Sequence, residues 1–315
     1  MARVRAGAFR LAPLLAVGLL ARPAAAQPAP PVFSSQVDVV KLTVVARDRD
    51  GALVTDLGRE DFTVLENGRP QRLALFARAV EPGQEEVMAL DLGLLMDTSE
   101  SMLKQLRLSQ QAAVRFLEAI PRARDLLTVF FDQDIQVSRY DSESQQGLIE
   151  RLQSVKGGGN TALYDAIAVY LSRVTDSAGG RKVAVLFTDG EDSISSTGVG
   201  EVLDLVRSSG VTVYAIGFED FASARRASQA RAFLGQVTAV SGGEVFSPRG
   251  PRELPAIYDA ILDQLKAQYV LGFVSDDPAT DGKFRKLKVL PSRKDLRLRH
   301  REGYFAGTGA TAASR

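Results

Sequence analysis

The stretch Leu92-Gly-Leu-Leu-Met-Asp97-Thr-Ser99-Glu-Ser101 passes from an apolar run straight into one carboxylate and two hydroxyls at alternate positions. A continuous apolar run is typical of a strand that is buried on both faces of a parallel sheet. In open α/β sheets, ligands bind beyond the carboxyl ends of the strands, which is where Asp97, Ser99 and Ser101 fall. This pattern predicts a metal site at the end of a central strand.

The residues that follow alternate between apolar runs and segments with helical spacing of apolar side chains. The runs predict strands, and the spaced segments predict the helices that connect them. We expect strands at 87–96, 125–131, 135–140, 182–187, 211–218 and 244–246, and helices at 103–120, 145–155, 161–174, 199–208, 224–240 and 251–266. Repeated strand-helix units imply a Rossmann-like, doubly wound, mostly parallel α/β sheet with helices on both faces.

Both flanks of this α/β region have β character. In the N-terminal flank (37–80) we expect a strand at 37–46 and a hairpin that joins Phe62–Glu66 to Gln71–Ala77. Asn67-Gly68 is typical of a type I′ turn, although the loop is predicted to be slightly longer than two residues, and Pro70 fits an edge strand. In the C-terminal flank (268–306) strands are expected at 269–274, 284–290, 296–299 and 304–305.

Neither flank is large enough to bury a core by itself. We therefore expect the two flanks to pair into one small β-sandwich, with the α/β domain (87–267) inserted between its strands. A break at 81–86, Glu-Pro-Gly-Gln-Glu-Glu, separates the first flank from the inserted domain.

Residues 1–26 have the three parts of a signal peptide. Arg3, Arg5 and Arg10 precede an apolar run at 11–21, which is followed by Ala24-Ala-Ala26. The run is shorter than the ~20 residues that a membrane-spanning helix needs, although an uncleaved anchor is the alternative. A Pro-rich linker (27–36) and a disordered tail (307–315) are also expected. The predicted mature protein is exported, has no transmembrane segment, and is periplasmic or secreted.

The charge of the chain argues against a nucleic-acid partner. Loss of residues 1–26 removes four Arg and no acid, so the formal net charge moves from +1 to −3. The mature protein is therefore not generally basic. The chain has no Cys and one His, which excludes a disulfide and disfavours Ser-His and Cys-His catalysis.

Two later positions extend the predicted metal site. Thr161 follows Gly157-Gly-Gly159-Asn at the start of a helix, and Asp189 follows the strand at 182–187. Neighbouring parallel strands bring such loops to one edge of the sheet. Together with Asp97, Ser99 and Ser101 they form an all-oxygen set, which favours Mg²⁺, with Mn²⁺ and Ca²⁺ as alternatives.

The region 87–267 resembles a von Willebrand factor type A domain that carries a metal-ion-dependent adhesion site. The pattern Asp-x-Ser-x-Ser, a later Thr and a later Asp is matched by Asp97, Ser99, Ser101, Thr161 and Asp189. The flanks resemble those of bacterial secreted proteins called VWFA-related. The resemblance implies that the three hydroxyls bind the ion directly, and that the two carboxylates bind it directly or through water.

The resemblance also implies a function. Neutral hydroxyl ligands leave much of the ion's charge uncompensated, so the open coordination position attracts an anionic oxygen, usually an Asp or Glu of a protein partner. We expect a non-enzymatic adhesion or assembly module with no catalytic residues and no organic cofactor. The alternative is a metal-dependent hydrolase of phosphate or sulfate esters at the same site, and a third interpretation is an ion that only stabilises the fold.

Several other residues have two interpretations. Glu100 and Met102 could touch a partner or could be solvent-facing loop residues, and Asp165 and Asp192 could support the site or cap a helix. The alternating arginines at 297, 299 and 301 are interpreted as the solvated face of an edge strand, with an anionic surface or polymer partner as the alternative. The Gly-rich loop before Thr161 lacks the Lys of a phosphate-binding loop, which argues against a nucleotide site.

Overall fold

The computed structural model describes residues 39–80, 89–120, 123–141, 144–174, 180–218, 224–277 and 279–307. The predicted signal peptide, the linker, the break at 81–86, the strand residues at 37–38 and 87–88, and the tail beyond Gly307 lie outside the described residues, as do Pro121 and Pro278. By its contacts the chain divides after Gln36, and every described helix and strand belongs to the unit that begins at Val37. No helix in the described ranges is long and apolar enough to cross a membrane.

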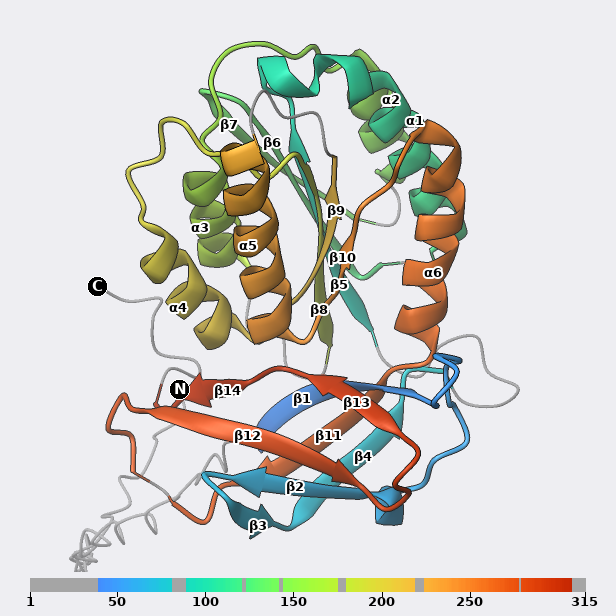
Figure 1. Ribbon diagram of the computed structural model, residues 1–315, viewed down its shortest axis with the longest axis vertical. Helices are drawn as coiled ribbons and strands as arrows, with labels where there is room; N and C mark the ends of the chain where they lie inside the picture. Colours follow the sequence, from blue (N-terminus) through green and yellow to red (C-terminus); the bar gives the residue numbers. More distant parts are fainter. Residues whose placement is uncertain are drawn as a thin grey trace, which may run out of the picture. The chain divides into compact units, whose positions relative to one another are not determined.

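The strand β5 (Leu90–Asp97) lies inside a six-stranded sheet and is buried along its whole length (Figure 1). The strand order is β10-β9-β8-β5-β6-β7. The other strands are β6 (Asp125–Phe131), β7 (Ile135–Tyr140), β8 (Arg181–Thr188), β9 (Thr212–Gly217) and β10 (Val245–Phe246). All neighbours are parallel except β7, which runs antiparallel to β6 at one edge.

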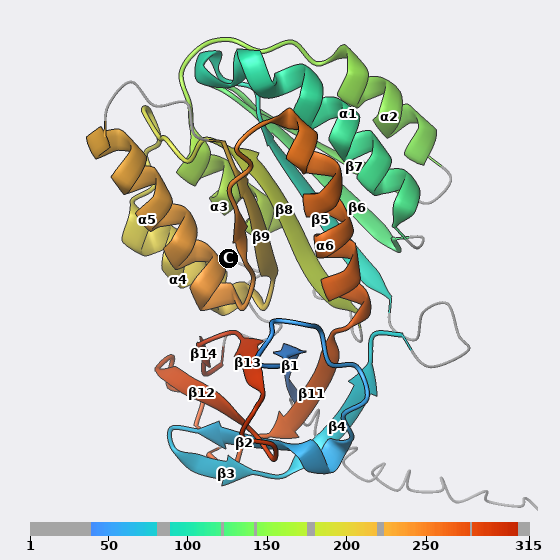
Figure 2. The ribbon, with the colours of Figure 1, turned by 45° about the vertical axis from the view of Figure 1, so that its right-hand side comes forward.

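Helices cover both faces of this sheet (Figure 2). One face packs against α1 (Leu103–Ala119), α2 (Gln145–Ser154) and α6 (Leu254–Lys266), and the other against α3 (Leu163–Arg173), α4 (Val199–Ser209) and α5 (Ala224–Ser241). Successive residues of β5 alternate between the two cores, since Leu94 and Met96 belong to the first and Leu95 to the second. The predicted doubly wound α/β fold is confirmed.

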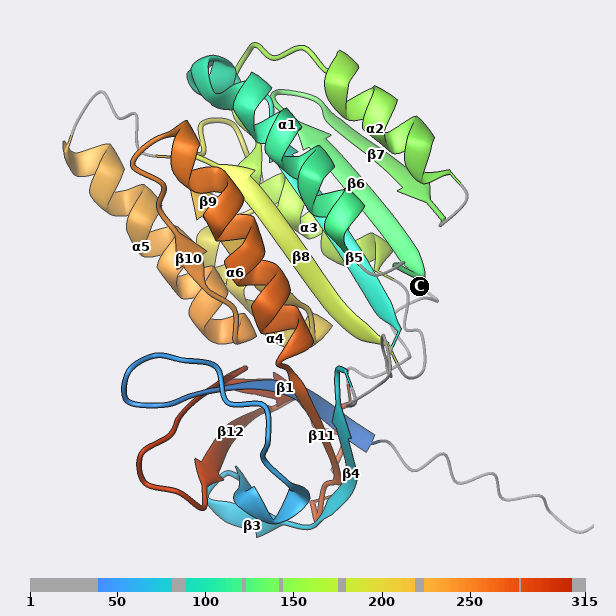
Figure 3. The ribbon, with the colours of Figure 1, turned by 90° about the vertical axis from the view of Figure 1, so that its right-hand side faces the viewer.

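The N- and C-terminal strands form two four-stranded antiparallel sheets that enclose a third core (Figure 3). One sheet has the order β13-β1-β11-β4, with β13 (Arg297–His300), β1 (Val39–Arg47), β11 (Tyr269–Val274) and β4 (Leu73–Arg78). The other has the order β14-β12-β2-β3, with β14 (Gly303–Phe305), β12 (Phe284–Pro291), β2 (Phe62–Glu66) and β3 (Arg69–Gln71). Since β4 precedes the α/β region and β11 follows it, that region is inserted in the sandwich as predicted.

The hairpin prediction was wrong in two respects. The segment Gln71–Ala77 is not one strand, because β3 ends at Gln71 and pairs with β2, whereas β4 begins at Leu73 and pairs with β11 in the other sheet. The turn is shorter than predicted, since Glu66 faces Arg69 and only Asn67 and Gly68 lie between them, with φ of 47° and 82°. The chain therefore crosses from one sheet to the other at Arg72.

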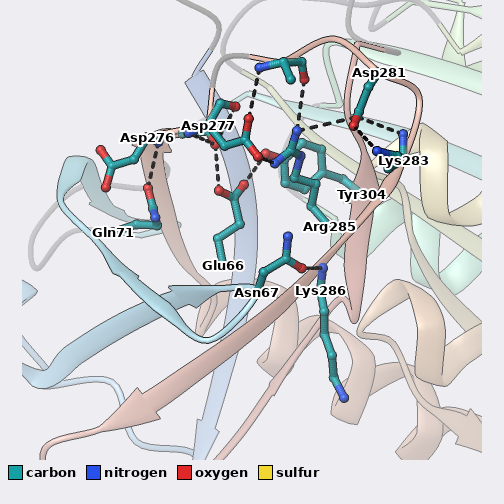
Figure 4. Close-up of polar contacts among 12 residues, drawn as sticks. Glu66, Asn67, Gln71, Asp276, Asp277, Asp281, Lys283, Arg285, Lys286 and Tyr304 are labelled. Atoms are coloured by element: carbon teal, nitrogen blue, oxygen red, sulfur yellow. Dashed lines mark hydrogen bonds and ion pairs between the residues drawn. The ribbon is translucent and has the colours of Figure 1, made fainter.

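A polar cluster fixes the loop between β11 and β12 (Figure 4). The buried guanidinium of Arg285 pairs with the carboxylates of Asp277 and Asp281 and donates to the carbonyl of Ala279. The buried carboxylate of Glu66 accepts a hydrogen bond from the hydroxyl of Tyr304. These contacts connect β2, β12 and β14 around the loop. The sheet β14-β12-β2-β3 is therefore stabilised by charged hydrogen bonds as well as by its apolar core.

The predicted solvated face of the last edge strand was wrong for two of its three arginines. Arg297 is exposed, but Arg299 contacts Glu244 and Gln264 of the α/β region. Arg301 donates a hydrogen bond of 2.6 Å to the carbonyl of Lys41. The alternation was interpreted correctly as an edge strand, but the inserted domain covers the face that was expected to meet solvent.

Candidate metal centre

The Asp97 carboxylate is fully buried at the carboxyl end of β5. Its Oδ1 accepts hydrogen bonds from the Ser99 amide at 3.0 Å and the Ser99 hydroxyl at 2.5 Å, and its Oδ2 accepts one from Thr188 at 2.6 Å. Burial raises the pKa of Asp97 to about 7, and these hydrogen bonds only partly oppose the increase. The protein therefore holds a carboxylate in one orientation at a position where its negative charge lacks solvation.

Hydroxyl groups lead from this carboxylate to the surface. Ser99 is 1% exposed, and its Oγ lies 3.2 Å from the Oγ of Ser101, which is exposed. The short helix η2 (Glu100–Met102) forms this turn and points Met102 into the core of the sheet. Neither interpretation of Met102 as a surface residue was correct, whereas Glu100 is exposed beside the hydroxyls.

Asp189 comes from the neighbouring strand β8, directly after Thr188. It is 3% exposed, and its Oδ1 accepts the Glu191 amide at 2.9 Å. Its negative charge is one of the causes that raise the pKa of Asp97, so the two carboxylates lie within electrostatic reach. In the ranges that the structure describes, neither carboxylate pairs with a basic side chain.

The Gly-rich loop before Thr161 places this residue next to the turn after β5. Backbone hydrogen bonds tie the Gly-rich loop to the turn after β5, with Gly158 N–H donating to Thr98 O at 2.7 Å and Glu100 N–H to Gly159 O at 3.0 Å. A Cβ at Gly157 would lie 2.6 Å from Thr98 O, so glycine permits this close approach. Thr161 itself is 5% exposed, but its hydroxyl makes no hydrogen bond to the other four side chains within the described residues.

The segment 192–197 braces Thr161 and the start of α3. The Thr161 amide donates to the Ser193 hydroxyl at 2.9 Å, and the Ser193 amide donates to the Thr161 carbonyl at 2.9 Å. Asp192 accepts the Tyr164 amide at the start of α3, and Asp165 accepts the amides of Ser196 and Thr197. Asp192 therefore caps the start of α3, as the capping interpretation has it, whereas Asp165 does not cap a helix but holds the segment at Ser196 and Thr197 in place.

Thr188 and Ser193 are supporting residues that the sequence interpretation missed. A threonine that directly follows the apolar run 183–187 and directly precedes an aspartate was a usable signal for Thr188. Nothing in the local sequence marks Ser193, because its role depends on a contact with Thr161, 32 positions away.

The donor atoms suit a hard divalent cation. The described residues contain no cluster of three or more His, Cys, Asp and Glu side chains that could hold a metal. Asp97 and Asp189 instead combine with hydroxyls, and all-oxygen sets of this kind suit Mg²⁺, Mn²⁺ or Ca²⁺ rather than a soft metal. A buried pair of carboxylates without a basic partner is electrostatically unfavourable, and a divalent cation would compensate it.

A groove of about 540 Å³ opens beside the Asp189 loop. Gly190, Glu191 and Asp192 line one side, and Arg226 and Phe233 of α5 line the other. The groove gives a partner molecule room next to the candidate metal centre.

Comparisons with known proteins agree with this fold. Residues 91–260, more than half of the 315-residue chain, match the family model for the von Willebrand factor type A domain. A von Willebrand factor type A structure from Catenulispora acidiphila is 12% identical, has a TM-score of 0.50, and the match covers 86% of this chain and 75% of that one. This likeness shows the fold alone.

Two further solved structures each match more than half of this chain. An aerotolerance-related membrane protein from Bacteroides fragilis is 17% identical with a TM-score of 0.46, over 56% of this chain and 98% of its own. Proximal thread matrix protein 1 from the mussel byssus, with a zinc-occupied MIDAS motif, is 16% identical with a TM-score of 0.47, over 58% of this chain and 47% of its own. No curated protein matches the sequence.

Proposed function

The chain belongs to the von Willebrand factor type A domain family, and we propose that it is an exported, non-enzymatic protein-binding module that uses a divalent cation at a metal-ion-dependent adhesion site. The ligands would be Asp97, Ser99, Ser101, Thr161 and Asp189, with Mg²⁺ as the first candidate ion and Mn²⁺ or Ca²⁺ as alternatives. The proposed domain boundaries are those of the sequence interpretation, with a signal peptide at 1–26 and the α/β domain at 87–267.

The observation that carries the proposal is the buried carboxylate of Asp97, which has a second carboxylate nearby and a chain of hydroxyls that leads to the surface. A cation bound there would have the neutral hydroxyls as direct ligands on its outer side, and the two acids would reach it from the inner side, directly or through water. Its outer side would then keep a positive potential, and the open coordination position there would attract an acidic oxygen of a protein partner.

The residues around the site support binding better than hydrolysis. The single histidine, His300, lies in β13 of the sandwich, where its Nε2 accepts the Val289 amide. Glu191, at the edge of the groove, has an ion pair with Arg226 at 3.6 Å. A Mg²⁺-dependent turnover assay with generic phosphate and sulfate esters tests the hydrolase alternative, and turnover that disappears in Asp97→Ala would favour it.

Affinity capture tests the binding function. Immobilised protein would be exposed to an envelope extract with Mg²⁺, eluted with EDTA, and the eluted proteins would be identified by mass. We expect specific proteins in the EDTA eluate of the wild type and of the exposed-surface control Asp259→Ala, and none with a folded Asp97→Ala variant. Retention that persists in EDTA, or in Asp97→Ala, would contradict the proposal.

A further inference from the structure

The ends at which β8 and β9 begin lie next to β1 of the sandwich (Figures 1 and 3). A second polar cavity lies there, at the end of the sheet opposite the candidate metal centre. Its volume is about 200 Å³. Side chains from both parts of the fold line it, among them Lys41 and Thr43 of β1, Arg181 and Lys182 of β8, and Arg301 between β13 and β14.

The walls of this cavity carry charge of one sign. Lys41, Arg181, Lys182 and Arg301 line it, and no Asp or Glu of the described residues does. Asp91, whose Oδ2 lies near Gly180, is bound by Arg124 at 2.6 Å and 2.8 Å. A concave wall with several positive charges and low-dielectric surroundings concentrates anions.

Arg301 is the clearest sign that a negative charge belongs here. One end of its guanidinium donates to Lys41 O at 2.6 Å, and the group lies over the Tyr304 ring at 5.7 Å. Its Nε is buried without a hydrogen-bond partner, and no carboxylate of the described residues pairs with it. Burial lowers its pKa to about 10, so the group is still charged at neutral pH and lacks a counter-charge.

Hydroxyl donors complete the wall. The Oγ1 atoms of Thr43 and Thr212 lie 3.0 Å apart, so one hydroxyl donates to the other and the second proton stays available to a ligand. Arg181 is already oriented by hydrogen bonds to Leu265 O and Gln268 Oε1 at 2.8 Å and 2.9 Å. The remaining donors of the cavity thus come from β1, from Thr212 at the start of β9 and from the turn before β14, which suits an acceptor with oxygens in several directions.

We propose that this cavity binds a tetrahedral oxyanion, a phosphate or sulfate group, through Lys41, Arg301 and the Thr43–Thr212 hydroxyl pair. The group can be a free ion or the headgroup of an acidic lipid, because the same oxygens are recognised in both. The site does not depend on the candidate metal centre, which lies at the carboxyl ends of β5 and β8, at the other end of the sheet.

Calorimetric titration of inorganic phosphate and of sulfate into the full chain tests the proposal, with EDTA present and NaCl keeping the ionic strength constant. We expect saturable binding to one site. Lys41→Gln should weaken it by about tenfold, because a charged hydrogen bond is lost. Lys288→Gln, which removes the same charge from an exposed position on β12, should leave the affinity unchanged, as should Asp97→Ala.

Two further measurements complete the test. Arg301→Lys, checked for folding by circular dichroism, keeps the charge but loses the fixed guanidinium, and should also weaken binding. Sedimentation with phosphatidylglycerol vesicles, against phosphatidylcholine vesicles, distinguishes the sources, since only a headgroup site gives vesicle binding that Lys41→Gln removes. No saturable binding of phosphate, sulfate or vesicles would overturn the proposal, as would equal loss in Lys41→Gln and Lys288→Gln.

Discussion

Asp97 is the residue on which the proposed metal site depends most. It is fully buried, accepts three hydrogen bonds and lies next to a second acid. We predict that Asp97→Ala lowers Mg²⁺ affinity by more than about 100-fold, because loss of an outer-shell partner alone costs roughly 10–100-fold. Isothermal titration of Mg²⁺ measures this, with Asp259→Ala as the surface control. Unchanged affinity in a folded Asp97→Ala variant would show that Asp97 is not a ligand.

His300 gives the sandwich a pH dependence at the residue scale. Its Nε2 accepts the Val289 amide at 3.1 Å and its Nδ1 donates to Arg301 O at 2.7 Å, so the ring is neutral. Burial, and then the charge of Arg301, lower its pKa below the usual 6.5, although the bond to Arg301 O opposes this. The neutral ring therefore stabilises the fold fully above pH 6.5, and this contribution is lost as the pH falls through 6.5 toward the lowered pKa.

We predict that the free energy of unfolding of the wild type decreases more steeply below pH 6.5 than that of His300→Gln, whose amide oxygen can still accept the Val289 amide. Urea unfolding at a series of pH values measures the difference. Identical pH profiles for the two proteins would mean that His300 makes no such contribution.

At the scale of the elements, Gly93 allows α3 to approach β5. A Cβ at Gly93 would lie 2.3 Å from the Tyr170 ring, which is 2% exposed in the core between α3 and the sheet. We predict that Gly93→Ala lowers the free energy of unfolding by about 1–3 kcal/mol, because extra atoms do not fit a packed core. Chemical denaturation measures it.

The matched control is Gly200→Ala in α4, where a Cβ would meet nothing within 4 Å. This change should be neutral or stabilising by up to about 1 kcal/mol, because alanine favours a helix over glycine. Equal changes in the free energy of unfolding for Gly93→Ala and Gly200→Ala would show that the close packing of Tyr170 on β5 does not require a glycine at position 93.

Much of the α/β fold could be predicted from the sequence because buried parallel strands and amphipathic helices have distinct local patterns. The change of sheet in the N-terminal flank could not be predicted. The residues before and after Arg72 both read as strand. Gln71 pairs locally with Val64, and only the long-range pairing of Leu73 with Phe273 places the next residues in the other sheet. Met102 was misassigned for a similar reason, since one turn of helix η2 decides that it faces the core.

Part of the candidate site could also be predicted from the sequence, and part could not. The positions of Asp97 and Asp189 at strand ends followed from the apolar runs before them, and neighbouring strands β5 and β8 bring them together. The supporting residues Thr188 and Ser193 were not predicted, because they act through hydrogen bonds to Asp97 and Thr161, which are far away in the chain. Local sequence determines where polar groups emerge, and the fold determines which of them meet.

At the scale of the whole molecule, Arg299 connects the sandwich to the inserted domain. Its guanidinium bonds the carboxylate of Glu244 and the amide oxygen of Gln264 in α6, and lies over the Tyr214 ring at 5.9 Å. Burial tends to raise the pKa of Glu244, but the hydrogen bond and charge of Arg299 outweigh it and lower the pKa. The side chain of Arg299 thus connects β13 of the sandwich to α6 and to the residue that precedes β10 in the inserted domain.

We predict that Arg299→Met lowers the free energy of unfolding by about 1–3 kcal/mol, because it leaves Glu244 without its main partner, and makes unfolding less cooperative between the two parts of the fold. Differential scanning calorimetry measures both effects. Arg297→Met, at the exposed end of the same strand, is the control and should change little. A single sharp transition at the wild-type temperature for Arg299→Met would contradict this role.

The most direct test of the proposed metal centre is anomalous diffraction from crystals of the protein soaked in Mn²⁺. We predict one strong anomalous peak within coordination distance of the Ser99, Ser101 and Thr161 hydroxyls, with Asp97 and Asp189 beside it, and no peak there in Asp97→Ala crystals. A wild-type map with no peak at this position, or with the same peak in Asp97→Ala, would contradict the account.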